Sequence, residues 1–317
     1  MAEFIEKLRE KARSIGFNSV GITSAEKLEQ EQARLAEWLE RGFHGEMHWM
    51  ARYGERRADP KLVLENAKSV IVTTTNYFTP YEHSKSPSAG KISRYAWGDD
   101  YHKVIRKRLE NLLGWVRKEL GDEIRGRVAV DSAPAMEKPL AVRAGLGWIG
   151  KNTNLITREA GSWVFIGLIL LDKELETTRP FDSDFCGSCM ACIEACPTGA
   201  LVEPYVLDSR QCISYATIEL RTEEMPDNIA ENLQGWIYGC DICQEVCPWN
   251  RFETDCESKE FAPRHDETEL ELKKVIEMTE DEYQKRFNSS SMKRAKLSGL
   301  KRNAKTLLKN KSQSRGK

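Results

Sequence analysis

Two cysteine runs constrain the fold of this chain more than any other feature. The first run extends from Cys186 to Pro197 and has the spacing C-x2-C-x2-C-x3-C-P. The second run, Cys240 to Pro248, ends in the same C-x2-C-x3-C-P spacing, and its missing first cysteine lies far upstream at Cys212. This is the spacing of bacterial ferredoxins that carry two iron–sulfur clusters. The sequence therefore predicts two [4Fe–4S] clusters.

In this pattern, three closely spaced thiolates hold one cluster, and the fourth cysteine ligates the other cluster. We expect each fourth cysteine, followed by proline, to start a helix that leads away from its own run. The ninth cysteine, Cys256, is predicted to be a spare thiol. The predicted ligands are Cys186, Cys189, Cys192 and Cys247 for the first cluster, and Cys212, Cys240, Cys243 and Cys196 for the second.

Disulfides and zinc are the alternatives for so many cysteines. Disulfides form in oxidising compartments, but residues 1–7 are charged and helix-like rather than an apolar secretory signal. Zinc sites also use C-x2-C pairs, but a third cysteine at the same step, followed by x3-C-P, is not typical of them. These arguments favour clusters in a reducing cytoplasm, and we expect a cytoplasmic location.

Length and composition indicate more than one domain. The chain has 317 residues, of which 40% are hydrophobic and 31% charged. These values permit a substantial core and two domains with additional segments. No apolar run approaches the ~20 residues that span a membrane. We therefore expect no membrane contact.

The net charge of −1 conceals an asymmetry. Residues 285–317 contain twelve Lys or Arg and no Asp or Glu, so the remainder of the chain carries −13. Such a basic segment suits a polyanion, because binding releases counterions from phosphates. The alternative is a solvated, frayed terminus. In residues 289–310 an apolar stripe predicts a helix that packs back on the protein.

The N-terminal half reads as alternating helices and strands. Apolar periodicity predicts helices over 2–15, 25–41 and 93–120, and strands over 19–23, 69–75, 127–131 and 163–171. The strand over 127–131 ends on Asp131. A polar residue at the end of a strand often faces a ligand crevice in α/β folds. From the residues alone, however, a helix N-cap is the simpler role for Asp131.

Residues 145–150 contain a literal G-x-G-x-x-G. That motif indicates a dinucleotide fold only where it leaves a strand and opens a helix. Here a helix-like segment precedes it and a strand-like segment follows it. We interpret it as a tight glycine loop in which backbone approaches something flat, not as an NAD site.

The combination of these features closely resembles the epoxyqueuosine reductase family, over nearly the whole chain from Ser14 to Asn310. The resemblance rests on the two cysteine runs, on Cys212-Ile-Ser214 and on five further motifs. These are Arg57-x-Asp-Pro60, Trp97-Gly-x-Asp-Tyr-His102, Val130-Asp-Ser-Ala-Pro134, Glu137-Lys138 and Ala144-Gly-Leu-Gly-Trp-Ile-Gly-Lys-Asn152.

The resemblance implies an α/β (α+β) cobalamin-binding domain over residues 1–175. A ferredoxin-like domain with two [4Fe–4S] clusters would follow over 176–262, and a basic helical segment over 263–317. It also implies reduction of epoxyqueuosine to queuosine at the tRNA wobble position, with electrons passing through both clusters to cobalt. Asp131 would be the proton donor, so we expect burial or hydrogen bonds to raise its pKa.

Cobalamin itself is supported only indirectly by the residues. The D-x-H-x-x-G motif that supplies a lower histidine ligand is absent, because Asp100-Tyr-His102 lacks the glycine. Histidine-free binding fits this absence, and so does a protein without cobalamin. By resemblance, the candidate cobalamin contacts are Asp131 with Arg57, Ser93, Leu155, Ile166, Ser214 and Asp241.

The resemblance also implies a tRNA partner and an electron donor of the ferredoxin or flavodoxin type, and we expect a monomer. Relatives often continue into a further helical-repeat domain, so RNA contact is expected to rest here on fewer elements. The predicted phosphate contacts are Lys293, Arg294, Lys301 and Arg302. Two other functions stay open at this point: a cobalamin-dependent reductive dehalogenase, and a non-enzymatic iron–sulfur electron carrier.

Overall fold

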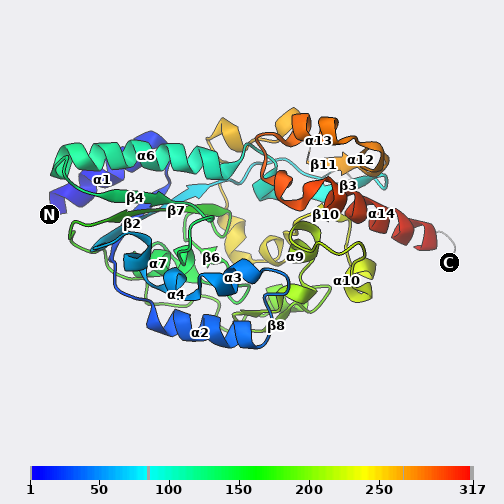
Figure 1. Cartoon of the computed structure of the whole chain (residues 1–317), viewed down its shortest axis with the longest axis horizontal. Coiled ribbons are helices and arrows are strands. Elements are labelled where there is room, and N and C mark those ends of the chain that lie inside the picture. Colours follow the sequence, from blue (N-terminus) through cyan, green and yellow to red (C-terminus); the bar gives the residue numbers. More distant parts are fainter. Residues whose placement is uncertain (1, 84–85, 267, 315–317) are drawn as a thin grey trace.

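A four-stranded antiparallel sheet forms the centre of the N-terminal half of the protein (Figure 1). We describe a computed structural model that covers residues 2–83, 86–266 and 268–314. The strand order is β1 (Ser19–Ser24), β2 (Ser69–Asn76), β7 (Val164–Leu171) and β4 (Gly126–Ala129). Every neighbouring pair is antiparallel, so the fold is of the α+β type rather than a doubly wound parallel sheet.

Both faces of this sheet are covered, which explains why β7 reads as a nearly continuous apolar run and why every residue of β2 is buried. Side chains alternate between the faces along a strand. Ile71 and Ile169 pack against α1 (Ala2–Ile15) and α6 (Tyr101–Leu120), whereas Val70 and Leu168 pack on the opposite side with α7 (Glu137–Arg143). Figure 1 shows α1 and α6 lying together over one face.

The C-terminal half is built around a three-stranded sheet, in the order β10 (Trp236–Tyr238), β3 (Ala89–Ile92) and β11 (Glu269–Glu271). Its central strand, β3, comes from the N-terminal part of the sequence. Ile92, Ala96 and Trp97 accordingly belong to the same core as α9 (Ile213–Ile218) and α14 (Lys296–Ser314). The proposed division at 175 and 262 stays a prediction, and this core crosses both positions.

The remaining elements are short. The helices are α2 (Glu29–Glu40), α3 (His48–Arg52), α4 (Gly54–Ala58), α5 (Pro60–Val63), α8 (Ala191–Glu194), α10 (Asp227–Glu231), α11 (Ile242–Glu245), α12 (Leu272–Glu277) and α13 (Glu280–Phe287). Two hairpins pair β5 (Trp148–Ile149) with β6 (Leu155–Ile156), and β8 (Leu201–Glu203) with β9 (Val206–Leu207). In the described part of the chain no helix is both long and apolar enough to cross a membrane.

Three predicted boundaries are corrected by the structure. The helix predicted from residue 93 begins at Tyr101, because the Asp100 carboxylate caps it by accepting a hydrogen bond from the His102 N–H at 3.1 Å. Strand β4 ends at Ala129, two residues before Asp131. No helix leads away from Cys196: the chain turns after Pro197 and enters β8. The short helix of that run, α8, precedes Cys196 instead.

The glycine loop at 145–150 follows α7 and leads into β5, as predicted, which is the reverse of a dinucleotide motif. The flat partner is not seen in the described residues. A Cβ at Gly145 would lie 2.3 Å from the Arg179 carbonyl, and one at Gly147 would lie 2.1 Å from the Ile156 carbonyl. Both glycines also have positive φ. They are therefore required by close backbone approach within the protein.

Candidate functional site

The seven cysteines of the two runs, together with Cys212, surround two cavities. The first has a volume of about 120 Å³ and is lined by the four cysteines predicted for the first cluster: Cys186, Cys189, Cys192 and Cys247. Lys151 closes one side, and its Nζ donates hydrogen bonds to the Gly187 carbonyl at 2.6 Å and the Cys189 carbonyl at 3.0 Å. The ammonium group thus fixes the loop that carries three of the thiols.

The second cavity, of about 240 Å³, is lined by the other predicted quartet: Cys196, Cys212, Cys240 and Cys243. Asn152 lines both cavities, and its Nδ2 donates to the Cys243 carbonyl at 3.1 Å. Cys192 on α8 and Cys243 on α11 remain with their own quartets. Cys196, which follows α8, lines the second cavity, and Cys247, which follows α11, lines the first. Each run therefore supplies one cysteine to the quartet of the other run, as the spacing predicts.

The four thiols of each quartet line the wall of a cavity and do not converge on one position. Among the described residues no group of three or more His, Cys, Asp or Glu is arranged to hold a single metal ion. Thiols around a cavity suit a cluster, in which several irons share the ligands. Cys256 lies outside both cavities, where its Sγ donates to the Asn76 carbonyl at 2.8 Å.

Asp131 lies where β4 and the start of α6 meet. Its φ of +47° is strained for a residue other than glycine, and the Ser132 N–H bonds back to the Val130 carbonyl. The Asp131 Oδ2 accepts hydrogen bonds from the Tyr101 hydroxyl at 2.5 Å and from His102 Nε2 at 3.2 Å. The carboxylate is 64% exposed, so it faces open space while two side chains orient it.

The expectation of a raised pKa for Asp131 is wrong for this arrangement. Desolvation by the surrounding protein acts to raise the pKa of Asp131, but the hydrogen bonds from His102 and Tyr101 outweigh it and leave the pKa below its ordinary value. The carboxylate is therefore ionised at neutral pH. Backbone position predicted a strand-end carboxylate, but not the donors that α6 brings to it.

His102 is protonated at neutral pH, whereas Asp131 is not. Burial acts to lower the pKa of His102, but hydrogen bonds to Asp100 and Asp131 outweigh it and raise the pKa to about 9. Nδ1 lies 2.8 Å from Asp100 Oδ1. At neutral pH the ring is an imidazolium that donates to both carboxylates. Sequence reasoning assigned no role to Tyr101 or His102, although both stand in the Trp97–His102 motif.

This network predicts a pH dependence of stability that His102→Gln should remove. The folded-state pKa of His102, about 9, exceeds the ordinary value of 6.5. Its contribution to the free energy of unfolding is thus complete below pH 6.5, declines between 6.5 and about 9, and is absent above that. We expect the difference between wild type and His102→Gln in urea unfolding to follow this course. A difference that is constant from pH 6 to 10 would contradict the network.

Two buried polar atoms beside Asp131 have no hydrogen-bond partner within the described residues: Arg57 Nε and Glu137 Oε1. The Asp131 charge acts on both groups. Burial, followed by the Asp131 charge, raises the pKa of Glu137 to about 8, so this carboxyl group is largely neutral at pH 7. Buried polar groups are normally satisfied, so orphaned atoms beside a functional carboxylate mark a place for a polar ligand.

The other predicted cofactor contacts are distributed unevenly. Ser93 and Ser214 line the second cysteine cavity. Asp241 is 1% exposed and accepts hydrogen bonds from the Ser93 hydroxyl at 2.5 Å and the Arg94 N–H at 2.8 Å. Burial raises the pKa of Asp241 to about 6. Leu155 and Ile166 pack into the core on the α7 side of the sheet. The cavity also exposes Lys138, which sequence reasoning left without a role.

Known protein families match the two regions of the chain that form this site. The family model described as "Epoxyqueuosine reductase QueG, DUF1730" matches residues 57–132, and the model of a 4Fe-4S double cluster binding domain matches residues 185–250. A protein named epoxyqueuosine reductase from Synechocystis sp. is 46% identical over 90% of this chain and 98% of its own length. The protein of that name from Escherichia coli is 40% identical over 92% of this chain and 77% of its own.

The chain belongs to the epoxyqueuosine reductase family. A relative from Atelocyanobacterium thalassa, 42% identical, is covered over its whole length by 97% of this chain. Among solved structures, an epoxyqueuosine reductase with an epoxyqueuosine-modified tRNA-Tyr stem loop matches with a TM-score of 0.88 and 31% identity. That match covers 98% of this chain and 82% of the other. The resemblance inferred from the motifs is confirmed, and the dehalogenase and electron-carrier readings are not supported by these relatives.

The basic C-terminal segment divides into surface and core. Arg302 was predicted to contact phosphates, which is wrong: the side chain is 7% exposed. Its guanidinium donates to the carbonyls of Ala216, Leu220 and Thr222, which end α9 and the following turn. The stripe of Leu300, Ala304 and Leu307 is buried in the C-terminal core, as predicted. The helical pattern of the sequence cannot distinguish an exposed basic side chain from an arginine that is buried and donates to the carbonyls of another segment.

Arg302→Ala is therefore expected to reduce stability rather than RNA affinity. It would leave the buried carbonyls of Ala216 and Leu220 without donors, and each unsatisfied group costs about 1–3 kcal/mol. We expect a loss of about 3 kcal/mol or more in the free energy of unfolding, measured by urea denaturation. Lys301→Ala, one position away on the half-exposed face, is the matched control and should change stability by less than ~0.5 kcal/mol. Equal effects of the two changes would contradict this role.

Proposed function

We propose that this chain reduces epoxyqueuosine to queuosine at the wobble position of tRNA. The observation that carries the proposal is the arrangement of two four-cysteine cavities and an ionised Asp131 that shares a proton with His102, in a chain of this family. Relatives of high identity bear the name of this activity. We place the protein in the cytoplasm with its tRNA partner.

The two quartets would hold two [4Fe–4S] clusters. The cavities share Asn152 as a wall, so electrons arriving at one cluster would have a short path to the other. Cys189 is the exposed cysteine of the first quartet, which makes that cluster the accessible one for an external donor. We propose a one-electron carrier of the ferredoxin or flavodoxin type as that donor.

We propose that cobalamin would bind between the second cavity and Asp131. Arg57 and Glu137 offer an orphaned donor and an orphaned acceptor there, and the amide side chains of a corrin ring supply both complements. Ser93 and Ser214 would approach it from the second cavity. When bound, cobalamin would supply low-potential cobalt chemistry toward the epoxide carbons. The described residues that line the second cavity include no histidine that could serve as a lower cobalt ligand.

Removing the epoxide oxygen as water takes two electrons and two protons. Asp131 would deliver one of these protons to the oxygen as the C–O bond opens, because its carboxylate is exposed, and solvent would supply the other. Its lowered pKa means that the proton must come from elsewhere, and the His102 imidazolium at 3.2 Å is the immediate source. Tyr101 keeps Asp131 oriented through the transfer.

The direct test is anaerobic reconstitution with iron, sulfide, cobalamin and a chemical reductant, followed by nucleoside analysis of tRNA that carries epoxyqueuosine. We expect conversion to queuosine only when both cobalamin and reductant are present. Conversion that is unaffected by omitting cobalamin would refute the cofactor, and no conversion with full cluster loading and bound cobalamin would refute the activity.

Lys293 and Lys301 remain the proposed phosphate contacts. Lys293 is exposed and Lys301 is half-exposed, whereas Arg294 is already paired with Glu219 through bonds of 2.8 and 2.7 Å. Each lysine changed to alanine should weaken tRNA binding at all sequences and lower the slope of log K against log salt by about 1. Deleting 289–317 is not an equivalent test, because it would remove buried core residues of α14. An unchanged slope in Lys293→Ala/Lys301→Ala would remove both contacts.

A further inference from the structure

Trp49 on α3 is a large apolar side chain exposed beside two cations. The ring is 38% exposed. The guanidinium carbon of Arg57 lies 4.9 Å from the ring centroid, and that of Arg294 lies 6.0 Å from it. These arginines come from α4 and from the turn before α14, so the two halves of the protein meet at this ring.

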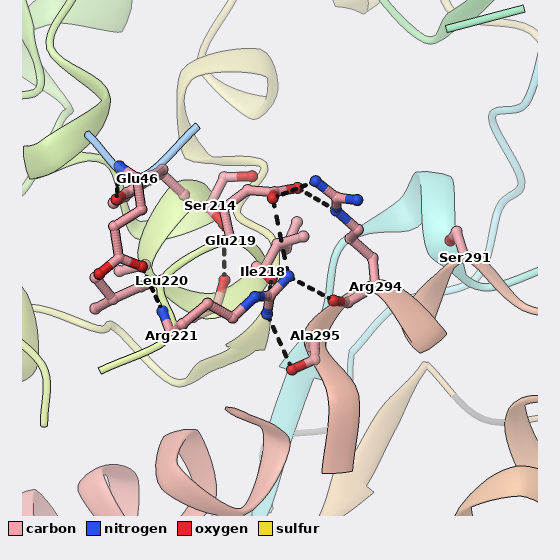
Figure 2. Close-up of polar contacts among 12 residues, drawn as sticks. Glu46, Ser214, Ile218, Glu219, Leu220, Arg221, Ser291, Arg294 and Ala295 are labelled. Carbon is pink, nitrogen blue, oxygen red and sulfur yellow. Dashed lines mark hydrogen bonds and ion pairs between the residues drawn. The ribbon is translucent and has the colours of Figure 1, made fainter. Parts of the chain in front are cut away.

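A polar network, which Figure 2 shows, fixes Glu46, three residues before Trp49. The Arg221 backbone N–H donates to Glu46 Oε2 at 2.7 Å, and its guanidinium donates to the carbonyls of Arg294 at 2.9 Å and Ala295 at 3.3 Å. The Arg294 guanidinium is in turn held by the Glu219 carboxylate. Arg221 thus links the segment before Trp49 to the turn that carries Arg294.

The turn before Trp49 is also built for this position. Gly45 has a φ of +54°, and a Cβ there would lie 2.5 Å from the Tyr215 hydroxyl. The neighbouring Glu46 N–H donates to that hydroxyl at 2.8 Å. The turn is therefore packed directly on Tyr215 of α9, four residues before Trp49.

Arg57, whose guanidinium lies over the ring, connects Trp49 to the Asp131 site. The charge of Asp131 acts on both arginines that flank the ring, and Arg57 carries the orphaned Nε of that site. A second exposed aromatic, Tyr53, follows one helical turn later and is 38% exposed. Two exposed aromatic side chains thus follow one another on this segment, and the guanidinium groups of Arg57 and Arg294 lie over the ring of the first.

We propose that Trp49 is a stacking platform for an unpaired tRNA base that flanks the modified nucleotide. An exposed indole with adjacent guanidinium groups matches a nucleobase, because a base offers a π-face and its phosphates attract the cations. Exposed cations of the basic segment 285–317, such as Lys293, add charge complementarity. This inference rests on the proposed function and adds a contact that no charge pattern predicts.

The test is binding of an anticodon stem loop to the anaerobically purified protein, followed by fluorescence anisotropy. We expect Trp49→Ala to weaken binding about tenfold and Trp49→Phe to stay within about twofold of wild type, because a phenyl ring still stacks. The salt dependence should not change, since no charge is lost. Tyr81→Ala, which removes an aromatic ring that is 42% exposed in the loop after β2, is the matched control and should bind as wild type.

Two further readouts separate stacking from a structural role. Stem-loop RNA should quench tryptophan emission more in wild type than in Trp49→Phe, and a blunt RNA duplex should bind wild type and Trp49→Ala equally because its bases offer no free face. Wild-type affinity of Trp49→Ala for the stem loop, or an equal loss for the duplex, would overturn the platform alone. A wild-type protein that binds neither RNA would overturn the platform and the proposed function together.

Discussion

Asp131→Asn is expected to lose about 10²–10⁴-fold in the rate of epoxyqueuosine reduction while keeping its iron–sulfur and cobalamin absorption. The amide has nearly the same shape and can still accept the Tyr101 hydroxyl bond, but it cannot take a proton from His102 and pass it on. The measurement is single-turnover conversion with pre-reduced enzyme, so that electron supply does not limit the rate.

His102→Gln is the matched variant for this experiment. It removes the nearest proton source but leaves the carboxylate, so we expect a smaller loss and a shift of the pH–rate profile. In wild type the imidazolium is lost as pH rises through about 9, so the rate should fall there, and in His102→Gln that fall should be absent. Wild-type turnover in Asp131→Asn would remove the carboxylate from the reaction.

Cys243→Ala and Cys192→Ala are each expected to abolish turnover and to remove about half of the bound iron. The two thiols line different cavities, so each change should disable a different cluster. Both clusters are needed if electrons pass from an exposed first cluster through the second to the reaction centre. The measurements are iron and sulfide content and the low-temperature EPR spectrum of the reduced protein.

The exchange of ligands between the two runs predicts which pairs of cysteine variants should lose the same cluster. Cys196→Ala should disable the same cluster as Cys243→Ala, although it belongs to the first run, and Cys247→Ala should disable the same cluster as Cys192→Ala. Cys256→Ala is the control, because its thiol lies outside both cavities, and it should keep full iron content. If Cys196→Ala and Cys192→Ala gave the same spectrum, the exchange would be wrong.

The sequence by itself determined the cysteine quartets, the apolar strands and the family. Cysteine spacing is a local property of the chain, and the two quartets can be predicted because cluster geometry allows few ways to close each one. Strand β7 was readable for a similar reason: both faces of the sheet are covered, so almost every residue in it is apolar. Strand β2 was readable from its β-branched Val, Ile and Thr residues.

Only the tertiary structure decided the chemistry of the individual polar groups. Asp131 has a lowered pKa because α6 brings His102 to it, and Arg302 is buried because α9 and the turn after it present carbonyls to its guanidinium. Trp49 is exposed between cations because Arg221 ties distant segments together. A side chain's ionisation and burial depend on partners from elsewhere in the chain, and these partners meet only when the chain has folded.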